Sequence, residues 1–162
     1  MSAALLLWSQ FTFALPNSQL SLEISAESVA RVALYYHYIP VTGEQIEFPL
    51  AVNNLSRKFE RESGFFYVVG NVDQADILFI DDKFELRPAS GLGQNMTLHG
   101  TFAFNGANKP ANQPLRMPVL KSAAQGNQAN GLKIRFASEY SIDGYSQGNY
   151  FNTFTLIVRP VI

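Results

Sequence analysis

The chain has 162 residues, of which 47% are hydrophobic and 15% are charged, and its formal net charge at pH 7 is −1. This length fits one domain, and the apolar fraction is enough for a packed core. The basic residues are scattered, so the sequence indicates neither a nucleic acid nor an anionic membrane as a partner. Because cysteine is absent, there is no disulfide framework, thiol nucleophile or thiolate metal site.

Residues 1–14 carry no charged side chain, and their apolar stretch is too short to span a bilayer as a helix. Thr12 and Ala14 are small residues, spaced as at the end of a secretory signal. The basic segment that opens such a signal is missing. We therefore expect residues 1–14 to be a truncated signal peptide and the protein to be exported. The alternative is an ordinary N-terminal strand of the domain.

The next segment alternates in polarity as a half-buried strand does, because side chains point to opposite faces of a strand in turn. Residues 19–26 place four apolar side chains on one face, namely Leu20, Leu22, Ile24 and Ala26. Further runs, some alternating and some continuously apolar, predict strands at residues 29–39, 45–54, 64–69, 76–80, 84–87, 95–104, 115–120 and 132–140. In the second of these, Ile46, Phe48, Leu50 and Val52 point one way.

The connections are predicted from polar, Gly-rich and Pro-rich segments. Residues 55–63 are charged and indicate a loop or an exposed edge. Residues 105–118 are rich in Asn and Pro and indicate a connection that holds the short strand at 115–120. Residues 122–131 indicate a flexible loop, or at most one helical turn.

A last strand follows the Gly-rich turn that ends at Gly148. Tyr150, Phe154, Leu156 and Val158 fall on one face of it. A hydrophobic last strand needs a neighbour, either from this chain or from another molecule. Pro160 cannot donate to a strand ladder, so we do not expect pairing to continue to the end of the run.

Seven to nine short strands with regular turn signals are typical of an all-β sandwich. No segment has a helical period over three turns, and no tandem repeat is visible.

The search for a chemical site finds few candidates. His37 and His99 are far apart in sequence and have no acidic or cysteine partner at ligand spacing. Four acidic residues, Asp73, Asp76, Asp81 and Asp82, are close in number, but the calcium-loop pattern and its glycine are absent. Turn acidity is the common explanation of such a group. We expect no catalysis, no metal and no cofactor.

Three further patterns have both a functional and an ordinary interpretation. Residues 91–93, Gly-Leu-Gly, lack the context of a phosphate loop. Asn54 and Asn95 begin N-glycosylation triplets, which occur by chance in most chains of this length. Tyr35, Tyr36 and Tyr38 form an aromatic group that suits sugar binding, although such alternation usually places one ring in the core and its neighbours on the surface.

The last strand, with a Gly and a Tyr before an alternating run, resembles the C-terminal strand of bacterial pilus subunits of the chaperone–usher type. Residues 19–27 are similar to the N-terminal extension of these subunits. The layout from Lys58 through residues 76–79 to residues 96–100 is loosely similar to that of the class 5, colonization-factor type. These motifs are patterns of alternation and not invariant residues.

The resemblance implies an immunoglobulin-like β-sandwich that lacks its last strand and is completed by donor-strand complementation. Residues 15–27 would be the donor-strand extension and residues 28–162 the pilin domain. The four apolar side chains of the extension would enter the groove of the next subunit, and Tyr150, Phe154, Leu156 and Val158 would line one wall of the acceptor groove. Such head-to-tail contacts do not close, so they build filaments.

The resemblance also implies partners and a location. The partners are a periplasmic pilus chaperone, an outer-membrane usher, other pilus subunits and a host receptor. The protein would pass through the periplasm to a fimbria on the cell surface. The alternatives are a self-contained, secreted β-sandwich module that binds a carbohydrate or a protein, with residues 19–26 paired within their own chain, and a β-sandwich enzyme.

Overall fold

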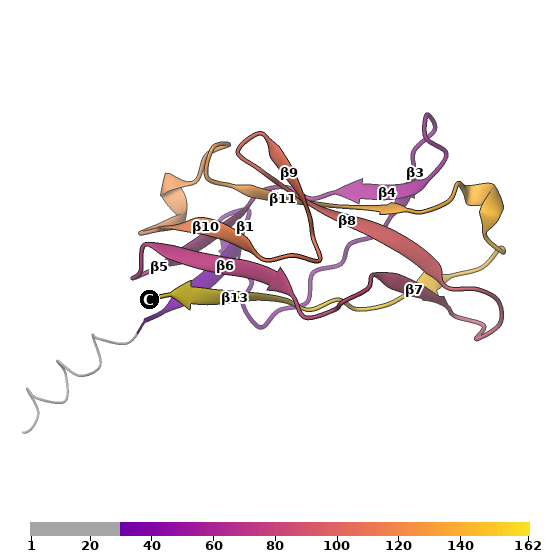
Figure 1. Cartoon of the computed structure of the whole chain (residues 1–162), viewed down its shortest axis with the longest axis horizontal. Coiled ribbons are helices and arrows are strands. Elements are labelled where there is room, and N and C mark those ends of the chain that lie inside the picture. The colour runs from indigo at the N-terminus through magenta and orange to yellow at the C-terminus, as the bar shows by residue number, and fades with distance from the viewer. Residues whose placement is uncertain (1–29) are drawn as a thin grey trace, which may run out of the picture. The chain divides into compact units, whose positions relative to one another are not determined.

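The computed structural model describes residues 30–162 (Figure 1). The expected signal peptide and the donor segment with Leu20, Leu22, Ile24 and Ala26 lie outside the described residues. Regular structure in the described part is nearly all β, which confirms the all-β prediction. None of the helices in residues 30–162 is long and apolar enough to cross a membrane.

Two short 3₁₀ helices, η1 and η2, accompany the strands of the described part, and their bounds are η1 (Ala123–Gln125) and η2 (Ile142–Gly144). The strands are β1 (Val32–Tyr36), β2 (Ile39–Pro40), β3 (Ala51–Val52), β4 (Phe59–Glu62), β5 (Phe66–Gly70), β6 (Gln74–Phe79), β7 (Glu85–Pro88), β8 (Met96–Phe104), β9 (Ala107–Pro110), β10 (Leu115–Leu120), β11 (Leu132–Ser138), β12 (Tyr150–Phe151) and β13 (Leu156–Val161).

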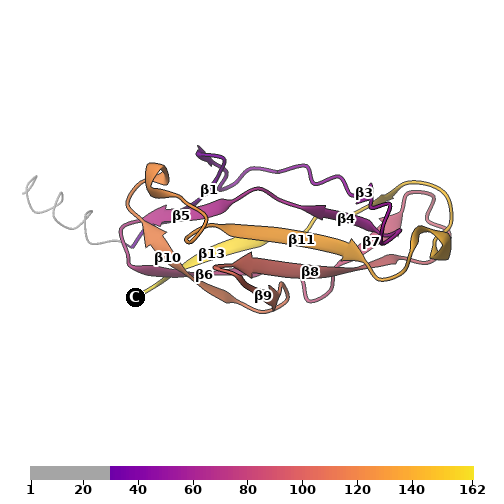
Figure 2. The same ribbon diagram turned by 90° about the horizontal axis from the view of Figure 1, so that it is seen from above.

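Backbone pairing joins these strands into one open sheet in the order β12-β7-β8-β11-β5-β10-β6-β13, with β1, β2, β3, β4 and β9 attached at its sides. β5 is where the sheet changes direction. One edge of β5 pairs with β1, while its other edge pairs first with β11 at Phe66 and then with β10 at Val68 and Val69. The sheet therefore folds back on itself, so that β6 faces β8 and β11 across the core (Figure 2).

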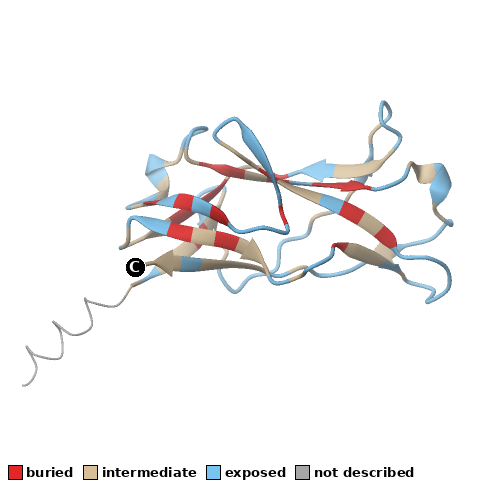
Figure 3. Ribbon diagram, viewed as in Figure 1, coloured by how far each residue is buried: buried red, intermediate tan, exposed pale blue. Residues whose placement is uncertain are grey.

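The core is built from the inward side chains of five strands, β5, β6, β8, β10 and β11, which carry most of the buried positions (Figure 3). The largest fully buried side chains are Phe102, Ile77, Met96, Met117, Leu132 and Val68. Phe79 of β6 stacks on Phe102 of β8 with 5.8 Å between the ring centroids. It also meets Phe136 of β11 edge-on at 5.7 Å. Each such buried side chain stabilises the fold by about 1.5–3 kcal/mol.

Two tight hairpins were not predicted. The predicted strand at 29–39 is interrupted, because His37 (φ 50°) and Tyr38 (φ 65°) turn the chain from β1 back into β2. Positive φ at both central residues is what a type I′ turn requires, and aromatic residues there give no turn signal in the sequence. Asn105 (φ 48°) and Gly106 (φ 75°) make the same kind of turn between β8 and β9. Asn-Gly is a strong hairpin signal, and the sequence prediction did not use it. The connection at 105–118 therefore also holds β9, while the strand predicted at 115–120 is present as β10.

The predicted strand at 45–54 and the predicted loop or edge at 55–63 also need correction. In the first range only β3 is a strand, and in the second β4 pairs with both β3 and β11. The charges of β4 suit its exposed face: Glu60 pairs with Arg135 at 2.7 Å and Glu62 with Lys133 at 3.3 Å, both across to β11. Of the two alternatives for 55–63, a loop or an exposed edge, residues 59–62 therefore form a polar strand, and the loop is confined to the residues on either side of it.

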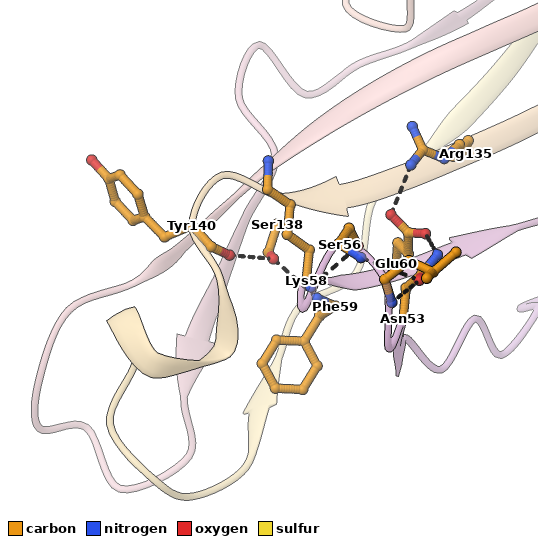
Figure 4. Close-up of polar contacts among 9 residues, drawn as sticks. Asn53, Ser56, Lys58, Phe59, Glu60, Arg135, Ser138 and Tyr140 are labelled. Atoms are coloured by element: carbon orange, nitrogen blue, oxygen red, sulfur yellow. Dashed lines mark hydrogen bonds and ion pairs between the residues drawn. The ribbon is translucent and has the colours of Figure 1, made fainter.

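Buried serines hold both ends of β4 against β11. Ser138 is fully buried, and its hydroxyl accepts a hydrogen bond from the Phe59 N–H at 3.1 Å and donates one to the Tyr140 carbonyl at 2.7 Å (Figure 4). At the other end, the Ser63 hydroxyl accepts from the Ile134 N–H at 2.8 Å. These side chains satisfy backbone groups where the ladder between the strands ends.

Tyrosine hydroxyls fix the connection between β11 and β12. The Tyr145 hydroxyl accepts a hydrogen bond from the Tyr140 N–H at 2.9 Å, and the Tyr150 hydroxyl donates to the Ser146 carbonyl at 2.9 Å. A tyrosine that bonds to the backbone a few residues upstream, where a strand begins, is a corner device of immunoglobulin-like sandwiches. The corner therefore fixes the point at which the chain enters its last strands.

Replacing Ser138 by Ala should destabilise the protein by about 1–3 kcal/mol, because the partly buried Phe59 N–H would lose its hydrogen-bond partner. Urea unfolding followed by far-UV circular dichroism measures this free energy. Ser146→Ala is the matched control, since this exposed side chain can be removed without touching its carbonyl. Equal stability of the Ser138 and Ser146 variants would contradict the role given to Ser138.

Candidate strand-accepting edge

The last strand runs along the rim of the sheet. All six residues of β13 are in register with β6, including Pro160 opposite Ala75 and Val161 opposite Gln74. The expectation that pairing stops before Pro160 was wrong. Among residues 30–162 no strand pairs with the other edge of β13.

The alternation of backbone hydrogen bonds along β13 explains how Pro160 fits into the ladder. The Ile80 N–H donates to the Thr155 carbonyl at 2.9 Å, just beyond the pair of Leu156 with Phe79. Because antiparallel ladders alternate, residues 155, 157, 159 and 161 bond to β6, and residues 156, 158 and 160 direct their backbone groups to the open edge. The missing N–H of Pro160 therefore lies on the open side, where proline is tolerated.

The structure divides the predicted last strand into β12, residues 152–155 and β13. Phe154, Leu156 and Val158 are half-buried and pack against the core. Tyr150 also packs against the core, but it lies in β12, which pairs with β7, and its ring contacts Tyr145. The predicted row of four therefore divides into three residues along the open edge and one at the corner.

A second row of half-buried side chains comes from residues 45–50, an extended segment that forms no strand and runs between β2 and β3 (Figure 2). Phe48 and Leu50 pack against the core. The centroid of the buried Phe136 ring is 5.8 Å from that of Phe48 and 5.5 Å from that of Phe154. Phe136 therefore lies between the two rows. We call the region bounded by residues 45–50 and residues 154–158, with Phe136 beneath it, the seam.

The opposite face of β13 is mixed, because Arg159 lies there between Ile157 and Val161. Arg116 of β10 pairs with Asp76 of β6 at 2.6 Å, and Arg159 of β13 adds positive charge beside the same carboxylate. The hydrogen bond from Arg116 holds the pKa of the Asp76 carboxyl below its ordinary value of 3.8. Desolvation opposes this, and the charges of Arg116 and Arg159 reinforce it. The apolar row thus lies on the core side of the sheet and the charges on the outer side.

The other candidate residues are dispersed. His37 lies in the first hairpin turn with its ring 4.1 Å from that of Tyr36, while His99 is exposed on β8. Asp81 is used structurally, because its carboxylate accepts a hydrogen bond from the Thr155 N–H at 2.8 Å. Residues 30–162 hold no group of three or more His, Cys, Asp or Glu side chains that could bind a metal ion.

Two shallow hollows lie outside the seam. One of about 280 Å³ is lined by residues of β3, β4 and β11, and there Glu60 is already held by Arg135 and Asn53. The other, of about 220 Å³, lies between β7 and the end of β9 and includes His99. Neither hollow is lined by the apolar row of β13.

Comparison with known proteins gives a likeness of fold. No family model matches the chain, and no curated protein sequence is significantly similar to it. A similar fold occurs in a solved structure described as a chaperone–tip adhesin complex that is vital for synergistic activation of CFA/I fimbriae biogenesis. The TM-score is 0.51 and the sequence identity 11%, over 82% of this chain and 42% of that chain. The present chain therefore spans about two fifths of the length of that one, and the likeness is one of fold.

The sequence predicted the apolar row of Phe154, Leu156 and Val158 but not the residues that surround this row. It missed Phe136 as the ring beneath the seam, since one buried Phe in an alternating strand looks like any other. It also predicted a paired strand where residues 45–50 lie extended and without a strand partner among the described residues.

The Asp76 carboxyl should titrate below 3.8 in the folded protein. Because this pKa is lowered on folding, its contribution to stability is present above the unfolded pKa and is lost as the pH falls through the folded pKa. NMR titration of the side-chain carboxyl measures the pKa directly. Arg116→Gln should raise it, whereas Arg87→Gln, which removes an equal charge from β7, should leave it unchanged. A pKa unaffected by Arg116→Gln would contradict the assignment.

Proposed function

We propose that the protein is a structural subunit of a bacterial surface fimbria that assembles by strand addition along the open edge of β13. The observation that carries this proposal is that this edge has no strand partner within residues 30–162 and lies beside the half-buried row of Phe154, Leu156 and Val158. An exposed sheet edge beside apolar side chains is an association hazard that proteins normally cover. A strand supplied by another molecule covers both at once.

The donor segment fits this edge by its pattern. Residues 15–27 carry Leu20, Leu22, Ile24 and Ala26 at every second position, so an extended segment places all four on one side. Each aliphatic side chain that becomes buried stabilises the complex by about 1.5–3 kcal/mol. The backbone hydrogen bonds then set the register.

The wider assignment follows from the fold and the pattern together. The fold resembles that of a chain in a fimbrial chaperone–tip adhesin complex. As a subunit of this kind, the protein would be exported through the periplasm, held there by a chaperone, passed to an outer-membrane usher and joined to other subunits. Adhesion to a host receptor would be a property of the assembled fimbria. No catalysis is proposed.

A self-contained binding module is the second candidate, because residues 19–26 could pair with β13 of their own chain. The two functions differ in solution. A module is a stable monomer when it is expressed without a chaperone, whereas a fimbrial subunit with an open edge depends on a chaperone or polymerises.

Deleting residues 15–26 should leave a subunit that binds its chaperone and does not polymerise, because the acceptor edge remains and the donor strand is gone. Co-purification with the chaperone and electron microscopy of assembled material measure the two properties separately. Unchanged filament formation by the deletion variant would reject the proposal.

A pair of point variants controls for the loss of length. Ile24→Asp places a charge on the apolar side of the donor segment and should abolish polymerisation. Ser25→Asp adds the same charge to the other side and should preserve it. If both variants polymerise equally, or both fail, the apolar side of this segment is not the inserted one.

A further inference from the structure

We infer that the strand accepted along β13 is short, because β1 closes the end of the seam nearest Pro160. The accepted strand pairs with β13 at Leu156 and Val158 and stops where β1 begins to occupy the edge. This inference rests on the proposed function and adds to it the length and register of the segment that the edge can hold.

The backbone groups of β1 follow the same alternation as those of β13. The Asn71 N–H donates to the Arg31 carbonyl at 3.1 Å, just beyond the pair of Val32 with Gly70. Residues 31, 33 and 35 therefore bond to β5, and residues 32, 34 and 36 direct their backbone groups to the opposite edge. This opposite edge is the one on which an additional strand would have to pair.

Residues 39–42 of the same chain already occupy most of that edge. The Leu34 carbonyl accepts from the Val41 N–H at 2.9 Å, and the Leu34 N–H donates to the Thr42 hydroxyl at 2.9 Å. Tyr36 is paired with Ile39 in β2. Both backbone groups of Leu34 are thus satisfied within the chain, and no second strand can bond to them at the same time.

Where β1 and β13 approach each other, their spacing also leaves no room for a strand between them. Some of their Cα atoms lie within 8 Å of one another. Neighbouring strands lie about 4.8 Å apart, so two strands that flank a third lie about 9.6 Å apart. In Figure 1 both strands lie at the same end of the sheet, beside the turn that joins β5 to β6.

Several contacts fix β1 in place, so that it can block the accepted strand from extending further. Leu34 is buried in the core, and the Tyr36 ring stacks on that of Phe66 at 4.4 Å between centroids. The Tyr36 hydroxyl also accepts a hydrogen bond from the Gly64 N–H at 3.0 Å. Moving β1 away from β13 would break these contacts as well as its pairing with β5.

The missing N–H of Pro160 removes one hydrogen-bond donor from the open edge, which agrees with an accepted strand that ends before this residue. From Phe154 to Val158 the seam measures about 13 Å in extended chain, whereas Leu20 to Ala26 of the donor segment measures about 20 Å. The seam therefore accommodates about three of the four alternating side chains of the donor segment at a time. The fourth lies beyond the seam.

Residue-resolved hydrogen exchange with a restored amide tests this stop. The full chain carries Ile24→Asp, so that its own donor segment does not fill the edge, and Pro160→Ala, which gives position 160 a backbone N–H. It is mixed with excess peptide of residues 19–27. NMR then follows four amides, those of Leu156, Val158, the substituted position 160 and Val32. We expect protection of the amides at 156 and 158 to rise by about tenfold or more, and protection at 160 and 32 to change by less than about twofold.

The outcomes separate this inference from the proposed function. Protection that extends to positions 160 and 32 would show that the strand passes β1 and would overturn the stop. No added protection at positions 156 and 158 would overturn strand addition itself and the stop with it. Pro110→Ala, on the exposed edge strand β9, is the matched control. Added to the same chain, it should leave peptide binding and all four protection factors unchanged.

Discussion

The structure depends on one constraint: every backbone group along the rim of the sheet needs a hydrogen-bond partner, and β13 has partners on one side only within residues 30–162. On the paired side, β6 fixes the register through all six residues. On the other side, the backbone groups of Leu156 and Val158 point to the open edge, while the side chains of these residues are half-buried against the core. The proposed assembly function is a consequence of this asymmetry, since a strand from another molecule satisfies the backbone and covers the apolar row in the same step.

The same constraint is met differently along β1. There the chain turns back at His37 and Tyr38, two bulky residues with positive φ, and uses residues 39–42 to satisfy the edge itself. Non-glycine residues in this conformation are costly, by about 1–3 kcal/mol each. The hairpin closes the edge of β1 while that of β13 stays open, which restricts strand addition to one place.

Period-2 alternation identified β8 and β11, and apolar runs identified β5 and β6. Alternation failed where polarity and pairing disagree. β4 is charged and yet paired, since Arg135 and Lys133 lie across from its carboxylates, and residues 45–50 alternate and yet have no strand partner in the described part. The row of Phe154, Leu156 and Val158 was predictable from the sequence, whereas its neighbours were not, because Phe136 and Phe48 reach it only through tertiary packing.

The most direct measurement of the central claim is a cross-link between donor and acceptor. The chain has no cysteine, so Ile24→Cys combined with Leu156→Cys or with Val158→Cys introduces one pair at a time. A disulfide forms when the two Cβ atoms come within about 3.5–4.5 Å. Strand addition between molecules predicts a ladder of covalent oligomers on a non-reducing gel for at least one pair. A cross-link found only within monomers, or the absence of any cross-link in both pairs, would contradict it.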